Sequence, residues 1–127
     1  MDDRMEPNES PERKMSEAIS DMAAGFISVG KTLAERQNRL IAVCSAWNMA
    51  CAPPENRRQQ LQQYAESYRR FNPTISPDDL ARIVKDMETL IERKLRMSPD
   101  DHRQIVDARV VPVGADFRIE VVSARSK

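Results

Sequence analysis

The residues of this sequence best suited to bind a metal ion or to attack a substrate are Cys44, Cys51 and His102. The two cysteines are separated by about two turns of a predicted helix, which places their α-carbons about 10 Å apart. A zinc site needs ligands that converge, and a disulfide needs α-carbons within about 7 Å of each other. We therefore predict structural thiols, with redox sensing or an intermolecular disulfide as the alternative, a surface histidine, and no metal or cofactor.

The stretch "GFISVGKT", residues 25–32, matches the bare spacing of a phosphate-binding loop: a glycine, four residues, and then Gly30, Lys31 and Thr32. Such a loop follows a buried strand, precedes a helix and belongs to a parallel sheet. Residues 12–24 show a helical pattern instead, and the rest of the chain predicts no parallel sheet. We therefore interpret the match as a coincidence within a helix.

Paired carboxylates occur in two copies of the tetrapeptide Ser-Pro-Asp-Asp, at residues 76–79 and 98–101. Such pairs can serve acid–base catalysis or hold a divalent ion. Here each pair follows a serine and a proline, which begin helices, and acidic residues stabilise the first helical turn. The sequence therefore predicts helix starts at Pro77 and Pro99. Because no set of residues converges on a reaction, we predict that the protein is not an enzyme.

The chain has 127 residues, with 20 basic and 20 acidic side chains, so its formal net charge is zero. This length suits one domain, and the balanced charge gives no overall field that would attract nucleic acid or an anionic membrane. The N-terminus lacks the basic start and apolar core of a signal peptide, and no window reaches the roughly 18 apolar residues of a membrane span. We expect a cytoplasmic protein with no membrane contact.

The acidic composition of residues 1–10 predicts a disordered leader. We predict a single helical domain over residues 11–127. Apolar residues then recur at alternating steps of four and three, the spacing of one side of a long helix. We call this set the seam; it consists of Met15, Ile19, Met22, Phe26, Val29, Leu33, Leu40, Val43 and Trp47, with the charged Arg36 among them. We predict one helix over about residues 11–51, with a break near Gly25 to Gly30 left open.

Pro53 and Pro54 end this helix, a second follows from Pro54 and a third from Pro77, with a short fourth through about Val106. Alternation around Gly114 predicts a β-hairpin over about residues 107–123. A lone hairpin is marginal in water, so it must lie on the helices or pair with another chain. The predicted fold is mainly α: a long N-terminal helix packed in a small helical bundle, with a C-terminal β-hairpin.

Four arginines and a tyrosine on the second predicted helix can reach phosphates or bases; they are Arg57, Arg58, Tyr64, Arg69 and Arg70. Glu55 and Glu66 reduce the local excess to about two positive charges, four minus two, which favours an ordinary solvated face. A nucleic-acid-binding regulator or packaging accessory is therefore the alternative function.

The favoured function follows from the length of the seam. Its span of about 50 Å at 1.5 Å per residue exceeds the radius of gyration of about 14 Å expected for a compact domain of this size. Part of the seam, or the hairpin edge, should therefore contact a partner. We predict a non-enzymatic protein–protein interaction module, such as an adaptor, assembly factor or regulatory subunit, that forms a homodimer. The predicted interface residues are Phe26, Leu33, Leu40, Trp47, Phe117, Ile119 and Val121.

Overall fold

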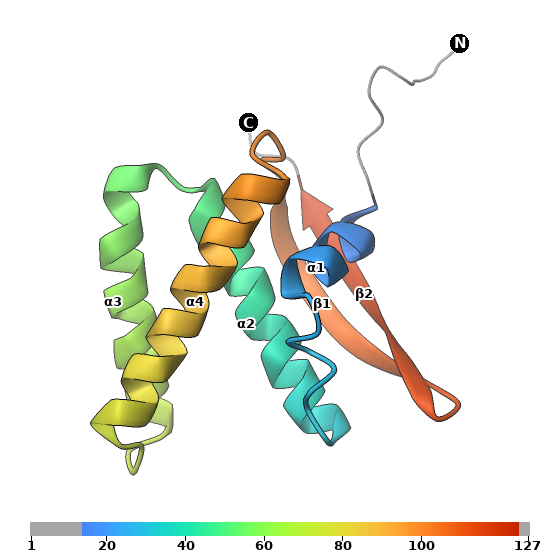
Figure 1. Cartoon of the computed structure of the whole chain (residues 1–127), viewed down its shortest axis with the longest axis horizontal. Coiled ribbons are helices and arrows are strands. Elements are labelled where there is room, and N and C mark those ends of the chain that lie inside the picture. Colours follow the sequence, from blue (N-terminus) through green and yellow to red (C-terminus); the bar gives the residue numbers. More distant parts are fainter. Residues whose placement is uncertain (1–13, 125–127) are drawn as a thin grey trace.

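A computed structural model of the chain describes residues 14–124; the predicted leader at residues 1–10 and the predicted helix start at residue 11 lie outside this part. Helices precede strands in the order α1 (Met15–Ala23), α2 (Leu33–Cys51), α3 (Pro54–Phe71), α4 (Pro77–Met97), β1 (Gln104–Val113) and β2 (Asp116–Ala124) (Figure 1). The prediction of a mainly α fold with a C-terminal β-hairpin is confirmed.

The prediction of one helix over residues 11–51 is wrong, and the break that it left open near Gly25 to Gly30 is present: the chain leaves helical geometry between α1 and α2. Ala24 ends α1 in the left-handed conformation, with φ 48° and ψ 49°, and Gly25 follows with φ 90°. Glycine adopts such angles readily, whereas a side chain disfavours them. The hydroxyl of Thr32 then caps α2 by accepting a hydrogen bond of 3.1 Å from the Glu35 N–H.

Gly30 allows the connecting loop to pass close to the first turn of α2. A β-carbon at this position would lie 3.0 Å from the backbone nitrogen of Arg36. The Arg36 side chain also donates a 2.9 Å hydrogen bond to the Gly30 carbonyl, and its guanidinium lies 4.6 Å from the centre of the Phe117 ring. The charged position of the predicted seam therefore holds the loop against the hairpin.

The break divides the predicted seam into two separate apolar faces. Met15, Ile19 and Met22 are buried from α1, and Leu40, Val43 and Trp47 are buried from α2, whereas Val29 and Leu33 between them are 61% and 47% exposed. The 19 residues of α2 span only about 29 Å. The premise that the chain has a seam of about 50 Å is therefore wrong.

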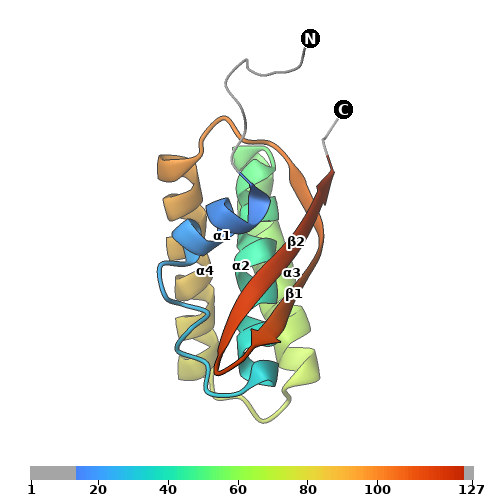
Figure 2. The same ribbon diagram turned by 90° about the vertical axis from the view of Figure 1, so that its right-hand side faces the viewer.

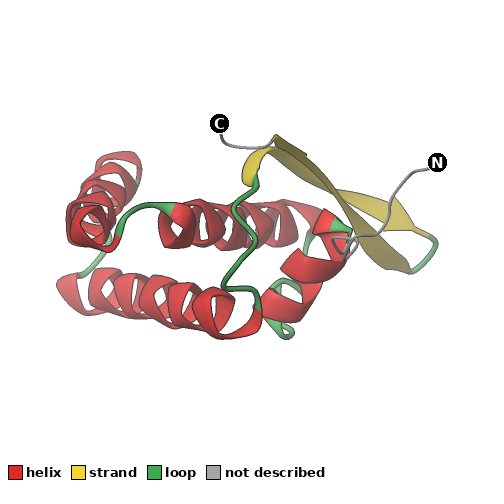
Figure 3. Ribbon diagram, turned by 90° about the horizontal axis from the view of Figure 1, so that it is seen from above, coloured by secondary structure: helices red, strands yellow, loops and turns green. Residues whose placement is uncertain are grey.

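α2 is the central helix of the fold. It contacts β1 on one side and α4 on another (Figures 2 and 3). α3 contacts α2 and α4 on the side away from the hairpin (Figure 1). α1 contacts α2, α4 and β2. The buried apolar residues come from α1, the α1–α2 loop, α2, α4 and the start of β1, and none of them comes from α3. α3 is therefore the least buried helix of the described part.

Trp47 joins α2, α4 and the segment that leads into β1. Its indole N–H donates to the Arg103 carbonyl at 2.7 Å, and the Lys94 ammonium lies 4.8 Å from the ring centre. Lys94 is 1% exposed and donates to the carbonyls of Ser98 and Asp101 at 2.7 and 2.6 Å. The fully buried Trp47 therefore fills the junction between α2 and the following elements.

The short helix predicted from Pro99 through about Val106 is wrong. Residues 98–103 form a loop, and the chain is extended from Gln104. Asp101 accepts two hydrogen bonds from the Arg103 guanidinium, at 2.9 and 2.6 Å, instead of capping a helix. The helix start predicted at Pro77 is confirmed, with the Ser76 hydroxyl as its cap.

The hairpin of β1 and β2 is antiparallel, and it confirms the strands predicted over residues 107–123 with slightly wider bounds. Gly114 and Ala115 connect Val113 to Asp116, and Gly114 has φ 60°, as the first position of a type II′ turn requires. The side chains that face the helices are half-buried; they are Ala108 and Val110 from β1 and Phe117, Ile119 and Val121 from β2.

Candidate functional site

The outer edge of β1 is closed by two amide side chains of α2. The Asn48 amide accepts a 2.9 Å hydrogen bond from the Ile105 N–H and donates a 3.0 Å bond to the Ile105 carbonyl. The Gln37 amide accepts from the Val110 N–H at 2.7 Å and donates to the Ala108 carbonyl at 2.9 Å. Because an amide offers both a donor and an acceptor, each side chain takes the place of a neighbouring strand.

The same contacts show which residues of β1 point their backbone groups away from β2. In an antiparallel pair, alternate residues direct both N–H and C=O outward. On β1 these are Ile105, Ala108, Val110 and, at the next position, Pro112, which has no N–H. The edge of β1 is therefore unavailable to another strand.

The outer edge of β2 is open by comparison. The register places Phe117, Ile119, Val121 and Ser123 opposite the outward residues of β1, so their own backbone groups also point outward. The Phe117 N–H bonds to the Asp116 carboxylate at 2.8 Å. Within residues 14–124, the outward groups of the other three have no hydrogen-bond partner. A hollow of about 150 Å³ separates Phe117 and Ile119 from the end of α1.

Charges alternate on the face of the hairpin that points away from the helices. Glu120 accepts hydrogen bonds from Arg118 at 2.9 Å on its own strand and from Arg109 at 3.0 Å on β1. These hydrogen bonds, first that of Arg118 and then that of Arg109, hold the pKa of Glu120 below its usual range. Glu120 thus stays ionised between two arginines directly beside the open edge.

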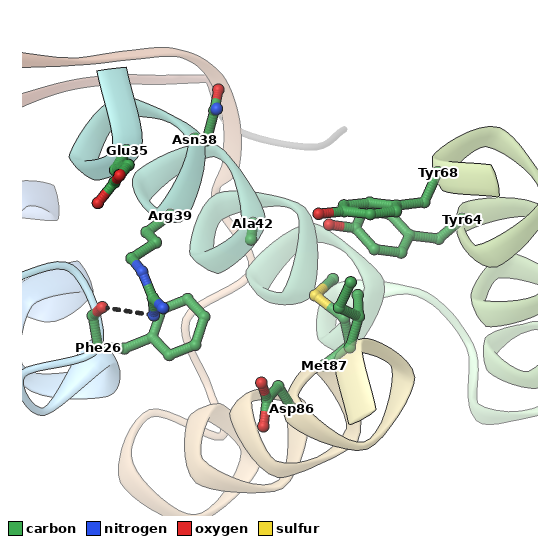
Figure 4. Close-up of a pocket in the computed structure, with 10 residues that line it drawn as sticks. Phe26, Glu35, Asn38, Arg39, Ala42, Tyr64, Tyr68, Asp86 and Met87 are labelled. Carbon is green, nitrogen blue, oxygen red and sulfur yellow. Dashed lines mark hydrogen bonds between the residues drawn. The ribbon is translucent and has the colours of Figure 1, made fainter. Parts of the chain in front are cut away.

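A second candidate surface is a groove of about 290 Å³ between α2, α3 and α4 (Figure 4). Tyr64 and Tyr68 point from α3 toward α2, with ring centres 6.3 Å apart, and Met87 rises from α4. Burial, and then the neighbouring Tyr68, raises the pKa of Tyr64. The groove exists because α2 presents the small side chain of Ala42 at the level of the two tyrosines.

The remaining wall of this groove is already occupied by contacts within the chain. The Arg39 guanidinium donates a 3.0 Å hydrogen bond to the Phe26 carbonyl and lies 4.6 Å from the centre of the Phe26 ring. Phe26, a predicted interface residue, is therefore half-buried against α2. This contact anchors the α1–α2 loop and leaves no free cation in the wall.

The arginines proposed for nucleic acid do not share one surface with Tyr64. Arg57 caps the end of α2 instead, donating to the carbonyls of Met49, Ala50 and Ala52 at 3.4, 3.0 and 3.3 Å. Tyr64 faces the groove. Arg58, Arg69 and Arg70 are exposed, and Glu66 lies beside the last two.

The groups that could do chemistry remain apart in the fold. Cys44 is buried, and burial raises its pKa to about 12. Cys51 is half-buried with its sulfur 3.6 Å from the Asp101 carbonyl oxygen, and burial is the main reason that its pKa is also raised. His102 is exposed. Within residues 14–124, no three histidine, cysteine or acidic side chains are placed to share a metal ion.

Residues 25–32, which match the spacing of a phosphate-binding loop, lie in the loop between α1 and α2 and not within a helix as predicted. The N-terminus of α2 is already bonded by its own residues. Glu35 accepts a 2.7 Å hydrogen bond from the Lys31 N–H, and Thr32 caps the helix. A carboxylate thus occupies the position that a phosphate would need, and the preceding element is a helix.

The predicted interface residues are spread over three environments. Leu40 and Trp47 are fully buried, so they have no surface to offer a partner, and Leu33 is 47% exposed at the start of α2. Phe117, Ile119 and Val121 come together at the open edge of β2. The sequence interpretation missed Gln37 and Asn48, although two amides about three helical turns apart lie on one face of a helix, which is a usable signal.

Comparisons with family models, curated proteins and solved structures found no match to this chain. In the part of the chain that the structure describes, no helix combines the length and the apolar character needed to cross a membrane. The two hairpin edges and the groove are therefore the features of this fold that bear on function.

Proposed function

We propose that the protein is a non-enzymatic protein–protein interaction module that self-associates by strand addition at the outer edge of β2. A strand edge with free N–H and C=O groups is a template for pairing with another chain. The observation that carries the proposal is the difference between the edges: Asn48, Gln37 and Pro112 close β1, while Ile119, Val121 and Ser123 of β2 have no hydrogen-bond partner within residues 14–124.

The composition of β2 supports this role. Proteins commonly protect an exposed edge with proline, with charged side chains, above all lysine, or with a covering segment, and β2 has only the charged Asp116, Arg118 and Glu120. The sequence of β2, DFRIEVVSA, contains neither proline nor lysine, and its apolar residues Phe117, Ile119 and Val121 are only half-buried against the helices. We take the helices, packed as a small bundle, to be the scaffold that holds this strand in place.

The test is the oligomeric state of wild type and Ile119→Pro, measured by sedimentation velocity over about 1 to 200 µM. The Ile119 N–H points away from β1, so proline removes a bond to the second chain without removing one from the hairpin. We expect a dimeric wild type, a monomeric Ile119→Pro with an unchanged circular dichroism spectrum, and a dimeric Ile119→Val. A monomeric wild type at the highest concentration contradicts the proposal.

The alternative, a nucleic-acid-binding regulator that uses α3, gains no support from the geometry. Arg57 is bonded to the end of α2, and Glu66 lies beside Arg69 and Arg70.

A further inference from the structure

We infer that the occupant of the β2 edge is β2 of a second copy of this chain, antiparallel about a two-fold axis at Ile119, and that assembly stops at two chains. The inference rests on the proposed function and adds the partner, the register and the stoichiometry.

The backbone allows few registers for this pairing. Two strands related by a two-fold axis form hydrogen bonds only if the outward residues of one strand face those of the other. The outward residues of β2 alternate from Phe117 to Ser123. With the axis at Ile119, the two Ile119 residues exchange N–H and C=O bonds, and Phe117 faces Val121 of the second copy. Apolar side chains then meet on the face that lies against the helices.

The charges favour this register over those centred at Arg118, Glu120 and Val121. With the axis at Ile119, Arg118 of each copy lies directly opposite Glu120 of the other, on the face that points away from the helices. With the axis at Arg118 or at Glu120, like charges face each other, which destabilises a strand pair. With the axis at Val121, Glu120 faces the apolar Val122. Only the axis at Ile119 extends the existing Arg109–Glu120 contact into an alternating row of charges across both chains.

The closed edge of β1 limits the assembly. The combined sheet would have the order β1, β2, β2, β1, so each outer edge would be that of a β1 strand. Asn48, Gln37 and Pro112 close this edge in every copy. A two-fold contact also uses the same surface on both chains, which gives a closed pair and not a fibre. The largest species should therefore be a dimer.

The test uses the variants Arg118→Glu and Glu120→Arg, alone and as an equimolar mixture. Alone, each places like charges opposite each other twice, and we expect the dimer dissociation constant to rise roughly tenfold or more. In the mixture, the two carboxylates of the Arg118→Glu chain would face the two guanidinium groups of the Glu120→Arg chain, so a one-to-one heterodimer should form. Its recovery also shows that both variants are folded. Matched reversals on α4, Lys85→Glu and Glu88→Arg, should leave the wild-type dimer unchanged.

The register has a separate test in cysteine cross-linking. Residues 118 and 120 of opposite copies face each other, so a mixture of Arg118→Cys and Glu120→Cys should form a mixed disulfide under mild oxidation. Arg118→Cys alone should form little, because its nearest counterpart lies across the diagonal of the strand pair. A prominent Arg118→Cys homodimer contradicts the axis at Ile119.

The outcomes separate the inference from the function on which it rests. If wild type is a dimer that Ile119→Pro dissociates, but neither charge reversal has an effect, the register is overturned and the proposed function stands. If wild type forms species larger than two chains, the closed assembly is overturned. If wild type is a monomer, both the inference and the proposed function fail. This holds even if a strand of a different protein binds this edge.

Discussion

The two edges of the hairpin differ in whether side chains bond their outward backbone groups, although both strands pack against the helices. The outward groups of β1 are bonded to Asn48 and Gln37, which lie 57 and 71 residues away in the sequence. Those of Ile119, Val121 and Ser123 on β2 have no hydrogen-bond partner within residues 14–124, although α1 contacts this strand. α2 thus places two half-buried amides against the backbone of β1, whereas its contact with β2 is that of Arg36 with the Phe117 ring, which bonds no backbone group.

Side chains that are distant in sequence therefore decide whether a strand edge is free to pair. An isolated hairpin would show two equivalent edges, and propensity alone would not distinguish them. Beside the second edge, the end of α1 and the following loop line a hollow with Phe117 and Ile119, and none of their side chains bonds the outward backbone of β2.

Trp47→Ala should have the largest effect, because it disturbs the anchor from which β1 starts. The substitution removes a fully buried ring and its hydrogen bond to the Arg103 carbonyl, and it should lower the free energy of unfolding by about 3 to 5 kcal/mol. Urea denaturation followed by circular dichroism measures this loss. As a control, Val29→Ala, at a side chain 61% exposed, should change the free energy by less than about 0.5 kcal/mol. A Trp47→Ala protein as stable as wild type would contradict the assignment of Trp47 to the core.

Asn48→Leu should open the closed edge. It leaves the N–H and C=O of Ile105 without their partner, which should destabilise the fold by about 1 to 3 kcal/mol. The freed edge should also allow species larger than a dimer, visible by sedimentation velocity. Asn38→Leu, an exposed asparagine of the same helix, is the matched control and should produce neither effect. If Asn48→Leu stays strictly dimeric, the amide does not limit the assembly.

Acid should weaken both the fold and the proposed dimer, but by less than the two substitutions above. Burial favours the neutral form of Asp101, but the hydrogen bonds of Arg103 and the charges of Arg103 and Lys94 outweigh it, so its pKa is lowered. The pKa of Glu120 is lowered by Arg118 and Arg109. A lowered pKa means that the stabilisation is complete above the unfolded value of about 4 and is lost as the pH falls through the folded value.

The measurement is the free energy of unfolding and the dimer dissociation constant between pH 7 and pH 3. Asp101→Asn should reduce the pH dependence of unfolding alone, whereas Glu120→Gln should reduce the pH dependence of both unfolding and dimerisation. If Glu120→Gln leaves the acid sensitivity of the dimer unchanged, Glu120 does not contact the second copy.

The sequence predicted those elements whose ends depend on local chemistry. Pro54 begins α3, Ser76 and Pro77 begin α4, and Gly114 turns the hairpin, as expected. The same tetrapeptide at residues 98–101 begins no helix, because Lys94 takes the carbonyls of Ser98 and Asp101 and an extended segment follows. A capping pattern therefore predicts a helix only when helical periodicity continues after it.

The sequence left a break near Gly25 to Gly30 open without deciding it, and it gave no sign of the role of the hairpin edge, because both depend on distant contacts. The spacing of the seam continues through residues 24–32, so periodicity gave no sign of the break. Arg36 and Arg39 reach back to the carbonyls of Gly30 and Phe26 and hold the loop. Ile119 was predicted as an interface residue, but its open backbone becomes apparent only when Gln37 and Asn48 are seen to close β1.

Phe71→Ser should have the smallest effect, and it distinguishes the β2 edge from the other exposed apolar surface. Phe71 is 81% exposed at the end of α3, on the same helical stripe as the groove residues Tyr64 and Tyr68. Since neither its ring nor the groove takes part in the proposed strand pairing, the substitution should change stability by less than about 0.5 kcal/mol and leave the dissociation constant unchanged. Sedimentation velocity of Phe71→Ser and Ile119→Pro, measured in parallel, compares the two surfaces. Loss of the dimer in Phe71→Ser, with Ile119→Pro still dimeric, would move the interface from the hairpin to the groove between α2, α3 and α4.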